Sequence, residues 1–518
     1  MPGSKSIFTV LRIALASLVL AVFTHTRADP DLWGHVRFGQ DTVAERTVHL
    51  PDRYSFASDR PWINHEWLAE VVMYGAYAAG GGAGLIALKV LLLGAMLAAA
   101  AATWRAAGLP AARRDVLIGL LLVGTAGQGN HVRPQLFSFA LFAWLLAILL
   151  RSHLYADVRI LPPARSDAGA SARPAHGRSL LVFAVVPMMA LWTNVHGGWL
   201  VGAGTLAVWA GLGLLTPLAI GDKLRVLCAA MAALAATLLN PYGWRLWLFL
   251  RETVGFGRAE ITEWQPVYRL GYGSVLLWAL VASAAVLPLA RASTRRSIDR
   301  RIVGVVIMLG VASFRVDRLL AFFTIAVTVL LGPHIAAALR RSESDTREST
   351  PGRLAIALSM AVAGAVLVGS AKIALGNMGC VRMEPERFPE PEVTRAVVDG
   401  NLHGRMLTWF DWGEYAIWHF WPAVTVSFDG RRETVYSDSA IQRQLRLYAN
   451  PSDRRATMEL LRPDYVWLPS ELPLTVGLLA DGWKPLVSGS RSVLLTKQPH
   501  TVSVPVTAQA TTRCFPGP

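Results

Sequence analysis

The chain has 518 residues, of which 53% are hydrophobic and only 16% charged, and its mean hydropathy is +0.39. Soluble domains carry about 25% charged residues, so the composition excludes an ordinary soluble enzyme and favours a membrane protein. The net charge of +15 does not indicate a nucleic-acid partner, because the arginines gather between apolar runs, at 105–114, 291–301 and 340–341.

Long apolar runs alternate with short polar stretches over residues 1–376, as in a polytopic helical membrane protein. The bilayer core offers no water to backbone polar groups, so each run is expected to be a helix. About eleven transmembrane helices are expected from the length of a bilayer span. In chain order they lie near 7–24, 83–104, 115–127, 134–151, 179–193, 198–219, 224–240, 274–290, 302–313, 319–338 and 352–376.

The arginine clusters predict the topology of this bundle. If the N-terminus is inside, every arginine cluster falls on the cytoplasmic side, as the positive-inside rule expects. The first external loop is then long, at 25–82, and the C-terminal part is external. The first run also resembles a signal peptide ending at Thr26-Arg27-Ala28. An uncleaved span and a cleaved signal both place Asp29 outside.

After residue 377 the pattern changes to short strands, at 405–410, 423–428, 464–469 and 492–497, with helices near 391–400 and 437–448. This predicts a small external α/β domain over 377–500 and a disordered tail over 501–518.

The chain has three cysteines, one in the predicted membrane part and two in the predicted external part. Cys228 lies inside a predicted span and is expected to be a packing residue. Cys380 and Cys514 lie in the external part, where an oxidising compartment permits a disulfide. The sequence alone leaves open whether they pair.

The stretch DPDLWGH (29–35) is the first candidate site. Asp29 and Asp31, in a turn held by Pro30, are spaced to face one cation, and Mg²⁺ or Mn²⁺ favours carboxylate ligands together with substrate phosphate. Trp33 and His35 would shape the pocket. The alternative is an Asp-Pro turn that caps a helix beginning at Leu32.

A second candidate in the same loop is NHEW (64–67), ahead of an apolar-faced helix. Glu66 and Glu70 share one face of that helix, and His65 and Glu66 are candidate catalytic residues. HExxH zinc binding is excluded, because Ala69 stands where the second histidine would be. The alternative is a capped interfacial helix with its tryptophan at the headgroup level.

Further polar clusters end spans on the same side. Each cluster alone is explained by snorkelling anchors or helix breaks, but ionisable residues at the membrane are costly and tend to line functional cavities. External arginines are expected to hold an anion such as a lipid phosphate. The substrate-binding candidates are His131, Arg133, Asn194, His196, Arg315 and Arg318.

Two other regions carry polar residues with competing interpretations. In the loop 241–273, Glu263 is a candidate partner of a substrate hydroxyl, whereas Glu260 is more typical of a surface turn. In the C-terminal part, the aromatics beside Asp411 and Arg431 either bind a sugar or fill the domain core.

The segments DPDLWGH, NHEWL, TEW (262–264) and FDGR (428–431) resemble those of uncharacterised bacterial membrane proteins with the GT-C arrangement. GT-C glycosyltransferases include oligosaccharyltransferases, protein mannosyltransferases and aminoarabinose transferases. The resemblance implies transfer of a sugar from a polyprenyl-phosphate donor to a glycan, lipid or protein acceptor at the external face of a bacterial inner membrane. It assigns to Asp31, and second to Asp29, the role of general base or metal ligand, although many relatives have adjacent Asp-Glu instead of DPD.

Two other functions remain open from the sequence. A transporter or flippase of lipid-linked glycans would place polar residues along the whole membrane depth, whereas here they cluster on one side. A non-catalytic envelope protein would use its external domain to recruit a partner.

Overall fold

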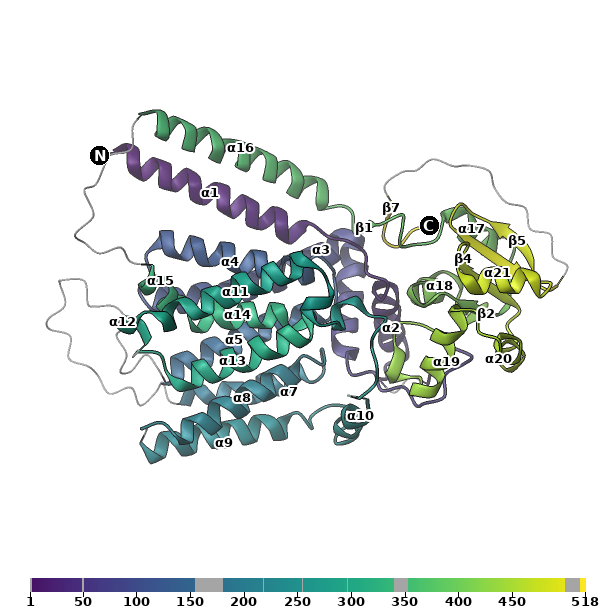
Figure 1. The fold of residues 1–518 in the computed structure, drawn as a ribbon, viewed down its shortest axis with the longest axis horizontal. Helices are drawn as coiled ribbons and strands as arrows, with labels where there is room; N and C mark the ends of the chain where they lie inside the picture. The colour runs from purple at the N-terminus through teal and green to yellow at the C-terminus, as the bar shows by residue number, and fades with distance from the viewer. Residues whose placement is uncertain are drawn as a thin grey trace.

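The computed structural model describes residues 2–48, 51–153, 180–217, 219–253, 255–295, 297–339, 353–498 and 513–518. These residues form a helical bundle and a smaller C-terminal unit, residues 382–498 and 513–518, built around a five-stranded sheet (Figure 1). Most of the tail predicted to be disordered lies outside the described residues.

A helix lies in each of the segments predicted as spans. Their bounds are α1 (Pro2–Thr24), α3 (Trp67–Ala106), α4 (Ala111–Gly129), α5 (Gln135–His153), η1 (Leu180–Ala184) with α7 (Val185–Trp192), α8 (Trp199–Leu214), α9 (Ile220–Ala236), α11 (Tyr272–Ala290), α13 (Arg300–Arg315), α14 (Leu320–Leu330) with α15 (Gly332–Ala338), and α16 (Arg353–Asn377). Shorter helices in the connections are α2 (Leu32–Glu45), α10 (Arg245–Thr253) and α12 (Ala292–Arg295), with 3₁₀ turns η2 (Thr262–Trp264), η3 (Val267–Arg269) and η4 (Asp317–Leu319).

Among the described residues, four helices are long and apolar enough to cross a membrane, or five if the bent pair α14 and α15 counts as one span. The four are Trp67–Ala106, Gln135–Ser152, Tyr272–Ala290 and Ala357–Asn377. Thr9–Thr24, Leu180–Trp192 and Trp199–Leu214 are shorter apolar helices. The larger count of about eleven spans stays a prediction.

The long helix α3 is kinked at two glycines, and the kink separates a first part that carries Glu70 from the longer remainder. Gly80 and Gly81 leave helical geometry, and Gly81 has a φ of +56°, a conformation that other residues adopt at a steric cost. The first part therefore runs at its own angle and buries Ala69, Glu70 and Met73. A buried glutamate on this segment already points to a polar interior at this end of the bundle.

Helices α1 and α16 lie side by side (Figure 1), joined by a 2.7 Å hydrogen bond from Ser370 to Ser17. The segments that follow these two helices also lie side by side, because the backbone N–H of Ala28 donates to the carbonyl of Arg382 at 2.7 Å. The stretch DPDLWGH and the beginning of the C-terminal unit are therefore fixed to each other directly.

The C-terminal unit holds the strands that the sequence predicts, in a mixed sheet of order β3-β2-β4-β6-β5. Strand β2 is parallel to β3 and β4, whereas β6 is antiparallel to β4 and β5. The strands are β2 (Gly404–Thr408), β3 (Val424–Val426), β4 (Tyr465–Pro469), β5 (Lys484–Ser488) and β6 (Ser492–Thr496), and the helices are α17 (Pro391–Asp399), α18 (Gly413–Phe420), α19 (Asp438–Tyr448), α20 (Arg454–Leu461) and α21 (Pro473–Ala480).

Helix α18 joins this sheet to the bundle, because it contacts both β3 and α2. Buried side chains of α2, such as Leu32 and Val36, belong to the same core cluster as Met406 and Trp467 of the sheet. The first loop and the C-terminal unit thus share one hydrophobic core, and the membrane helices have another.

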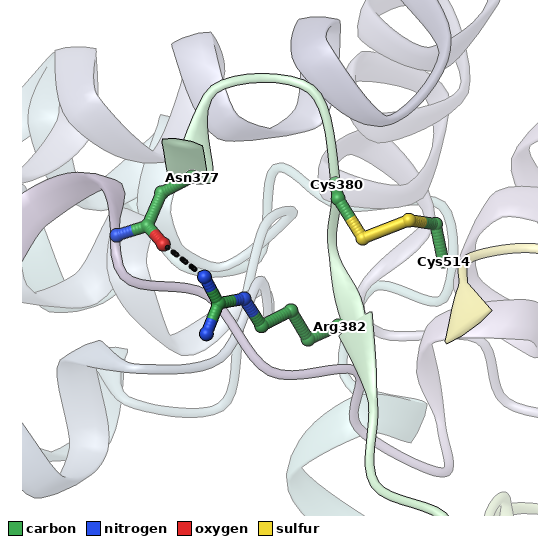
Figure 2. The surroundings of a disulfide bond; sticks show 4 residues. All are labelled: Asn377, Cys380, Arg382 and Cys514. Atoms are coloured by element: carbon green, nitrogen blue, oxygen red, sulfur yellow. Dashed lines mark hydrogen bonds between the residues drawn. A yellow bond between two sulfur atoms is a disulfide. The ribbon is translucent and has the colours of Figure 1, made fainter. Parts of the chain in front are cut away.

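The end of the chain is ordered, which corrects the prediction for residues 513–518. Strand β7 (Arg513–Cys514) pairs with β1 (Arg382–Met383), and Cys514 forms a disulfide with Cys380, next to the contact of Arg382 with Asn377 (Figure 2). Phe515 is 5% exposed. A disulfide and a buried aromatic side chain hold this segment, hereafter the C-terminal hook, where composition alone indicated disorder.

The packing role predicted for Cys228 is wrong. Cys228 is exposed on α9, whereas the alanines of the following turn, Ala229, Ala230 and Ala233, face the helical core. The apolar composition of a membrane helix is the same on its core face and its lipid face, so composition did not distinguish them.

Candidate active site

The turn DPD separates the roles of its two aspartates. Asp29 is fully buried, and its Oδ1 accepts the backbone N–H of Asp31 at 3.2 Å. Asp31 precedes α2, which begins at Leu32 as the capping alternative expected, but its side chain accepts no hydrogen bond from the helix. Asp29 therefore stabilises the turn, and the Asp31 carboxylate is left for another purpose.

Asp29 is the first member of an ion-pair ladder made of Asp29, Arg133, Glu263 and Arg318. Arg133 pairs with Asp29 Oδ2, and its other amino group donates to both oxygens of Glu263 at 2.8 and 2.9 Å. Arg318 donates to Glu263 Oε1 at 2.8 Å and lies over the ring of Trp264. Acidic and basic groups alternate, so each buried charge has a partner of opposite sign.

The ladder determines the charge of Asp29. Burial by itself raises the pKa of Asp29, but the positive charge of Arg133, with His131 nearby, brings the pKa well below its usual range. His131 Nδ1 lies 3.8 Å from Asp29 Oδ2. Asp29 is consequently ionised at neutral pH and cannot accept a proton in a reaction.

Asp31 has the opposite electrostatics. Burial, and then the negative charge of Asp29, raise the pKa of Asp31 to about 6. Among the described residues no donor hydrogen-bonds to its carboxylate. A carboxylate that titrates near neutral pH and has no structural partner is suited to take up a proton.

Glu414, on the first turn of α18, lies next to Asp31 and was not among the sequence candidates. Burial, and then the negative charges of Asp31 and Asp429, raise the pKa of Glu414 well above its usual range. No pattern in the sequence places residue 414 beside residue 31, because their proximity depends on the packing of α18 on α2.

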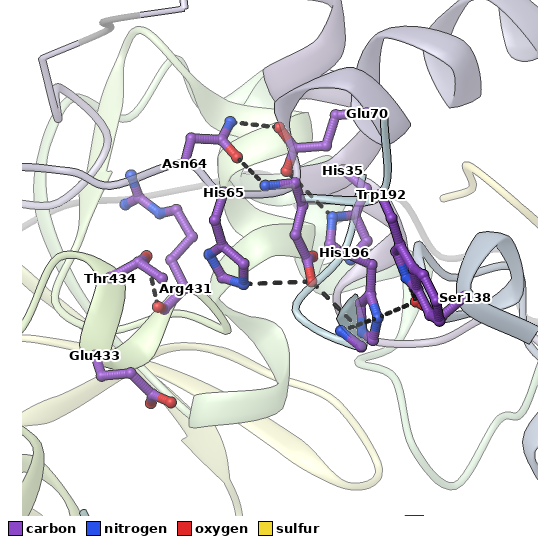
Figure 3. Close-up of polar contacts among 12 residues, drawn as sticks. His35, Asn64, His65, Glu70, Ser138, Trp192, His196, Arg431, Glu433 and Thr434 are labelled. Carbon is purple, nitrogen blue, oxygen red and sulfur yellow. Dashed lines mark hydrogen bonds and ion pairs between the residues drawn. The ribbon is translucent and has the colours of Figure 1, made fainter. Parts of the chain in front are cut away.

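Glu66 lies between two histidines, His65 and His196. His65 Nε2 and His196 Nε2 are 3.6 and 3.7 Å from Glu66 Oε1 (Figure 3). Burial works against the ionised form of Glu66, but these two neighbours lower its pKa below the usual value. The structure brings the candidates His65 and Glu66 together and adds His196 to them, and their catalytic role stays a prediction.

The tautomer of His196 is set by its surroundings. Its Nδ1 accepts the N–H of Gly198 at 2.9 Å and faces the Ser138 hydroxyl at 2.8 Å, and that hydroxyl already accepts the Trp192 indole N–H (Figure 3). A neutral ring therefore carries its proton on Nε2, which lies 3.7 Å from Glu66 Oε1 and 3.4 Å from the Arg318 guanidinium. Burial lowers the pKa of His196 to about 3, so the ring is a neutral donor.

His35 and Glu70 form a further contact beside this group. His35 Nδ1 lies 3.2 Å from Glu70 Oε1, and Asn64 donates to Glu70 Oε2 at 2.5 Å (Figure 3). Burial lowers the pKa of His35, but the hydrogen bond with Glu70 and the charge of Glu66 outweigh it and raise the pKa. These carboxylates thus favour the protonated form of His35.

Three predicted site residues lie elsewhere or are already engaged. Trp33 is fully buried among Phe388, Tyr415 and Phe515, and its N–H donates to the carbonyl of Pro516, so it is a core residue. The amide of Asn194 hydrogen-bonds to the indole of Trp67 and to two backbone carbonyls. Arg315 is exposed at the end of α13.

The aromatic cluster around Arg431 is also structural. Its guanidinium donates to Asp429 and Asp52, and it lies 5.0–5.2 Å from the ring centroids of Phe38, Tyr54 and Trp62. Of the two interpretations of the FDGR segment, the core interpretation fits this packing. Glu260 likewise pairs with Arg432, which links the bundle to the C-terminal unit.

The carboxylates Asp29 and Asp31 do not fit a shared Mg²⁺ or Mn²⁺. One oxygen of Asp29 is paired with Arg133 and the other accepts a backbone N–H, so the guanidinium occupies the place on Asp29 that a cation needs. Over the described part of the chain, no three His, Cys, Asp or Glu side chains are grouped to hold a metal ion.

Solved structures with a similar fold are membrane glycosyltransferases. The oligosaccharyltransferase of Archaeoglobus fulgidus in its apo form has a TM-score of 0.54 at 11% identity, over 90% of this chain and 70% of that chain. ArnT from Cupriavidus metallidurans bound to undecaprenyl phosphate has a TM-score of 0.50 at 14% identity, over 96% of this chain and 98% of that chain. A mutant of the arabinofuranosyltransferase AftD from Mycobacteria has a TM-score of 0.51 at 14% identity, over 95% of this chain and 42% of that chain.

No protein-family model matches the chain, and no curated protein matches it by sequence. At such low identities the structural likeness establishes the fold alone. The chain has a GT-C-like membrane glycosyltransferase fold, as the short motifs predicted.

Proposed function

We propose that the chain is an integral membrane glycosyltransferase that transfers a sugar from a polyprenyl-phosphate donor to an acceptor at the external face of a bacterial inner membrane. The observation that carries the proposal is Asp31, a carboxylate with a raised pKa and no hydrogen-bond donor among the described residues, within the electrostatic influence of the partly buried Arg133. The structural likeness to ArnT bound to undecaprenyl phosphate supports a lipid-linked donor.

In this reaction Asp31 acts as the general base. An acceptor hydroxyl transfers its proton to the Asp31 carboxylate while its oxygen forms a bond to the anomeric carbon of the sugar. The bond from that carbon to the donor phosphate breaks, and its electron pair leaves with the lipid phosphate. Because the pKa of Asp31 is about 6, it is ionised at neutral pH and yet basic enough to take the proton.

The leaving phosphate needs positive charge beside it, and Arg318 is the arginine best placed to provide it. Arg133 is held by two carboxylates, whereas Arg318 has one ion pair, to Glu263, and is more exposed. A phosphate at Arg318 would share the guanidinium with Glu263, as charged hydrogen-bond networks permit. Since Asp29 and Asp31 do not fit a shared cation, the mechanism assigns the charge on the phosphate to Arg318.

The proposal includes the orientation of the chain. The polar residues of the site lie at the end of the bundle next to the sheet, whereas the N-terminus and helix α12, in the arginine-rich segment 291–301, lie at the far end (Figure 1). With the positive-inside rule, this supports an N-in, C-out topology of about eleven spans, with the C-terminal unit outside the cytoplasm. The partners are then membrane lipid, the lipid-linked donor and a glycan, lipid or protein acceptor.

The test uses the purified full-length chain in lipid nanodiscs. Donors are polyprenyl phosphates carrying different single sugars, acceptors are envelope glycans and lipids, and the readout is released polyprenyl phosphate. We expect Asp31→Asn to reduce release by roughly 10²–10⁴-fold, the usual contribution of a general base. Equal release by the wild type and Asp31→Asn would reject the assignment of Asp31 as base.

Binding is measured separately with undecaprenyl phosphate as the probe. Arg318→Ala is expected to weaken binding about tenfold or more, because charged hydrogen bonds contribute about 1.5–3 kcal/mol. The matched controls are Arg446→Ala and Asp453→Asn, which alter an exposed surface ion pair, and neither binding nor release should change in them.

A further inference from the structure

Glu414 is a buried carboxyl group that the proposed reaction does not yet use. It is 3% exposed, and its Oε2 has no hydrogen-bond partner among the described residues. Burying a polar group without a hydrogen bond costs free energy, so such a group in a folded protein requires an explanation.

Two glycines leave the space that brings Glu414 to Asp31. A Cβ at Gly430, in the FDGR segment, would overlap Asp31 Oδ1 and lie 2.9 Å from Glu414 Oε1. A Cβ at Gly34, in DPDLWGH, would overlap Glu414 Oε2. Both short motifs therefore contain a glycine at the point where the two carboxyl groups approach each other.

Among the described residues, the basic groups near this pair are engaged by other acids. Arg133 is held by Asp29 and Glu263, Arg431 by Asp429 and Asp52, and His35 contacts Glu70. Two carboxyl groups that approach this closely without a cation of their own cannot both be ionised at low cost. A proton shared between them is the remaining way to compensate the charge.

We propose that Glu414 is a positioning residue for Asp31, to whose carboxylate it donates a hydrogen bond as a neutral acid. This inference rests on the proposed function, in which Asp31 is the base. The hydrogen bond fixes the orientation of the Asp31 carboxylate, with one oxygen directed to Glu414 and the other left for the acceptor hydroxyl. No proton moves between the two residues during transfer.

The proposal gives the C-terminal unit a part in the site. Glu414 and Gly430 belong to this unit, whereas Asp31 and Gly34 belong to the first loop of the bundle. The site is therefore complete only when α18 is packed on α2.

The first test is a substitution series measured by release of polyprenyl phosphate. Glu414→Gln keeps a donor of nearly the same shape, so it should retain release to within about threefold, whereas Glu414→Ala should lose roughly 10²-fold with KM unchanged. Glu390→Gln is the matched control, because Glu390 is a buried acid of the same unit that is held by Ser490 and Ser492. Its release per folded molecule should equal the wild type.

Two outcomes of that series would overturn the proposal. If Glu414→Gln is as inactive as Glu414→Ala, Glu414 acts as a charged group, either a base or a cation ligand. If Glu414→Ala is fully active, the contact has no part in catalysis. Gly430→Ala serves as a second variant, since its methyl group separates the two carboxyl groups and should reduce release as Glu414→Ala does.

The second test needs no substrate and separates the contact from the reaction. In a cycle of Asp31→Asn, Glu414→Ala and the double variant, thermal unfolding midpoints should be non-additive, because the residues interact directly. Non-additivity without any sugar transfer would reject the proposed function and keep the contact. Transfer with additive midpoints would keep the function and reject the positioning role.

Discussion

Asp29 and Asp31 stand two residues apart and are embedded in opposite surroundings. Asp29 belongs to the ion-pair ladder, in which Arg133 and Arg318 alternate with acids and every charge is compensated. Asp31 belongs to the pair with Glu414, in which two carboxyl groups approach each other without a cation. The first arrangement stabilises the fold, and the second is maintained at a cost in stability, as is common for groups that perform chemistry.

The difference has a simple structural origin. The turn around Pro30 directs Asp29 inward to the loop that carries Arg133, and it directs Asp31 to the C-terminal unit. One short sequence thereby contributes a residue that stabilises the fold, Asp29, and a reactive residue, Asp31. Substitutions at the two positions should change the free energy of unfolding in opposite directions.

The largest effect is expected from removing the centre of the ladder. Arg133→Ala leaves the buried Asp29 without its ion-pair partner, whereas Glu263 keeps Arg318. Breaking a buried ion pair in this way costs about 3–5 kcal/mol. The free energy of unfolding of the purified chain, measured by chemical denaturation in detergent, should fall by that amount.

Arg133→Ala combined with Asp29→Asn is the control for this prediction. Asp29→Asn removes the buried negative charge that Arg133→Ala leaves without a partner, so it should restore part of the lost free energy of unfolding. The double variant should therefore be more stable than Arg133→Ala alone. A loss below about 1 kcal/mol for Arg133→Ala would mean that the ladder behaves as an exposed surface pair.

A smaller effect is expected from releasing the C-terminal hook. The disulfide Cys380–Cys514 holds Phe515 and the Pro516 carbonyl against Trp33, two residues after Asp31. Replacing both cysteines by serine should lower stability by about 2–4 kcal/mol. Because the hook supports the Asp31 side of the turn, release of polyprenyl phosphate should fall, whereas undecaprenyl phosphate binding at Arg318 should be retained.

The exposed Cys228 provides the control for this experiment. Cys228→Ser should change neither stability nor release. If the double serine variant of the hook behaves in the same way, the disulfide has no part in holding Trp33.

Much of the fold was predictable because its signals are local. Apolar runs of sufficient length located the helices, and alternating segments such as 464–469 and 492–497 located strands β4 and β6. The bent pair α14 and α15 and the kink of α3 at Gly81 were not predicted, because they depend on packing rather than on composition.

The site was predictable only as a set of residues on one side of the membrane. Charge patterning grouped Asp29, Arg133, Glu263 and Arg318, and the structure brings these four into one ladder. Glu414 could not be found in this way, since its neighbour Asp31 is far away in the sequence. Trp33 was misassigned because the sequence does not distinguish a tryptophan that lines a pocket from one that packs in the hydrophobic core.

The smallest effect, of opposite sign, is expected from Asp31→Asn. The pKa of Asp31 is raised from 3.8 to about 6, so its ionised form destabilises the folded state at neutral pH by about 3 kcal/mol. The asparagine removes this charge but leaves a buried amide that must find hydrogen bonds. We therefore expect a net stabilisation of about 1–2 kcal/mol together with loss of sugar transfer, whereas Asp29→Asn should destabilise the chain.

The raised pKa of Asp31 also determines how the stability difference between the wild type and Asp31→Asn changes with pH. Well below pH 4, at about pH 3, Asp31 is mostly protonated in both the folded and the unfolded chain, so its ionisation costs little free energy. As the pH rises from about 4 to 6 the unfolded chain loses the proton first, and the wild type loses stability relative to Asp31→Asn. Above about pH 6 the difference is constant. Unfolding of the wild type and Asp31→Asn at pH 4, 5, 6 and 7 measures this difference in the free energy of unfolding, and a difference that shrinks with rising pH would contradict the raised pKa of Asp31.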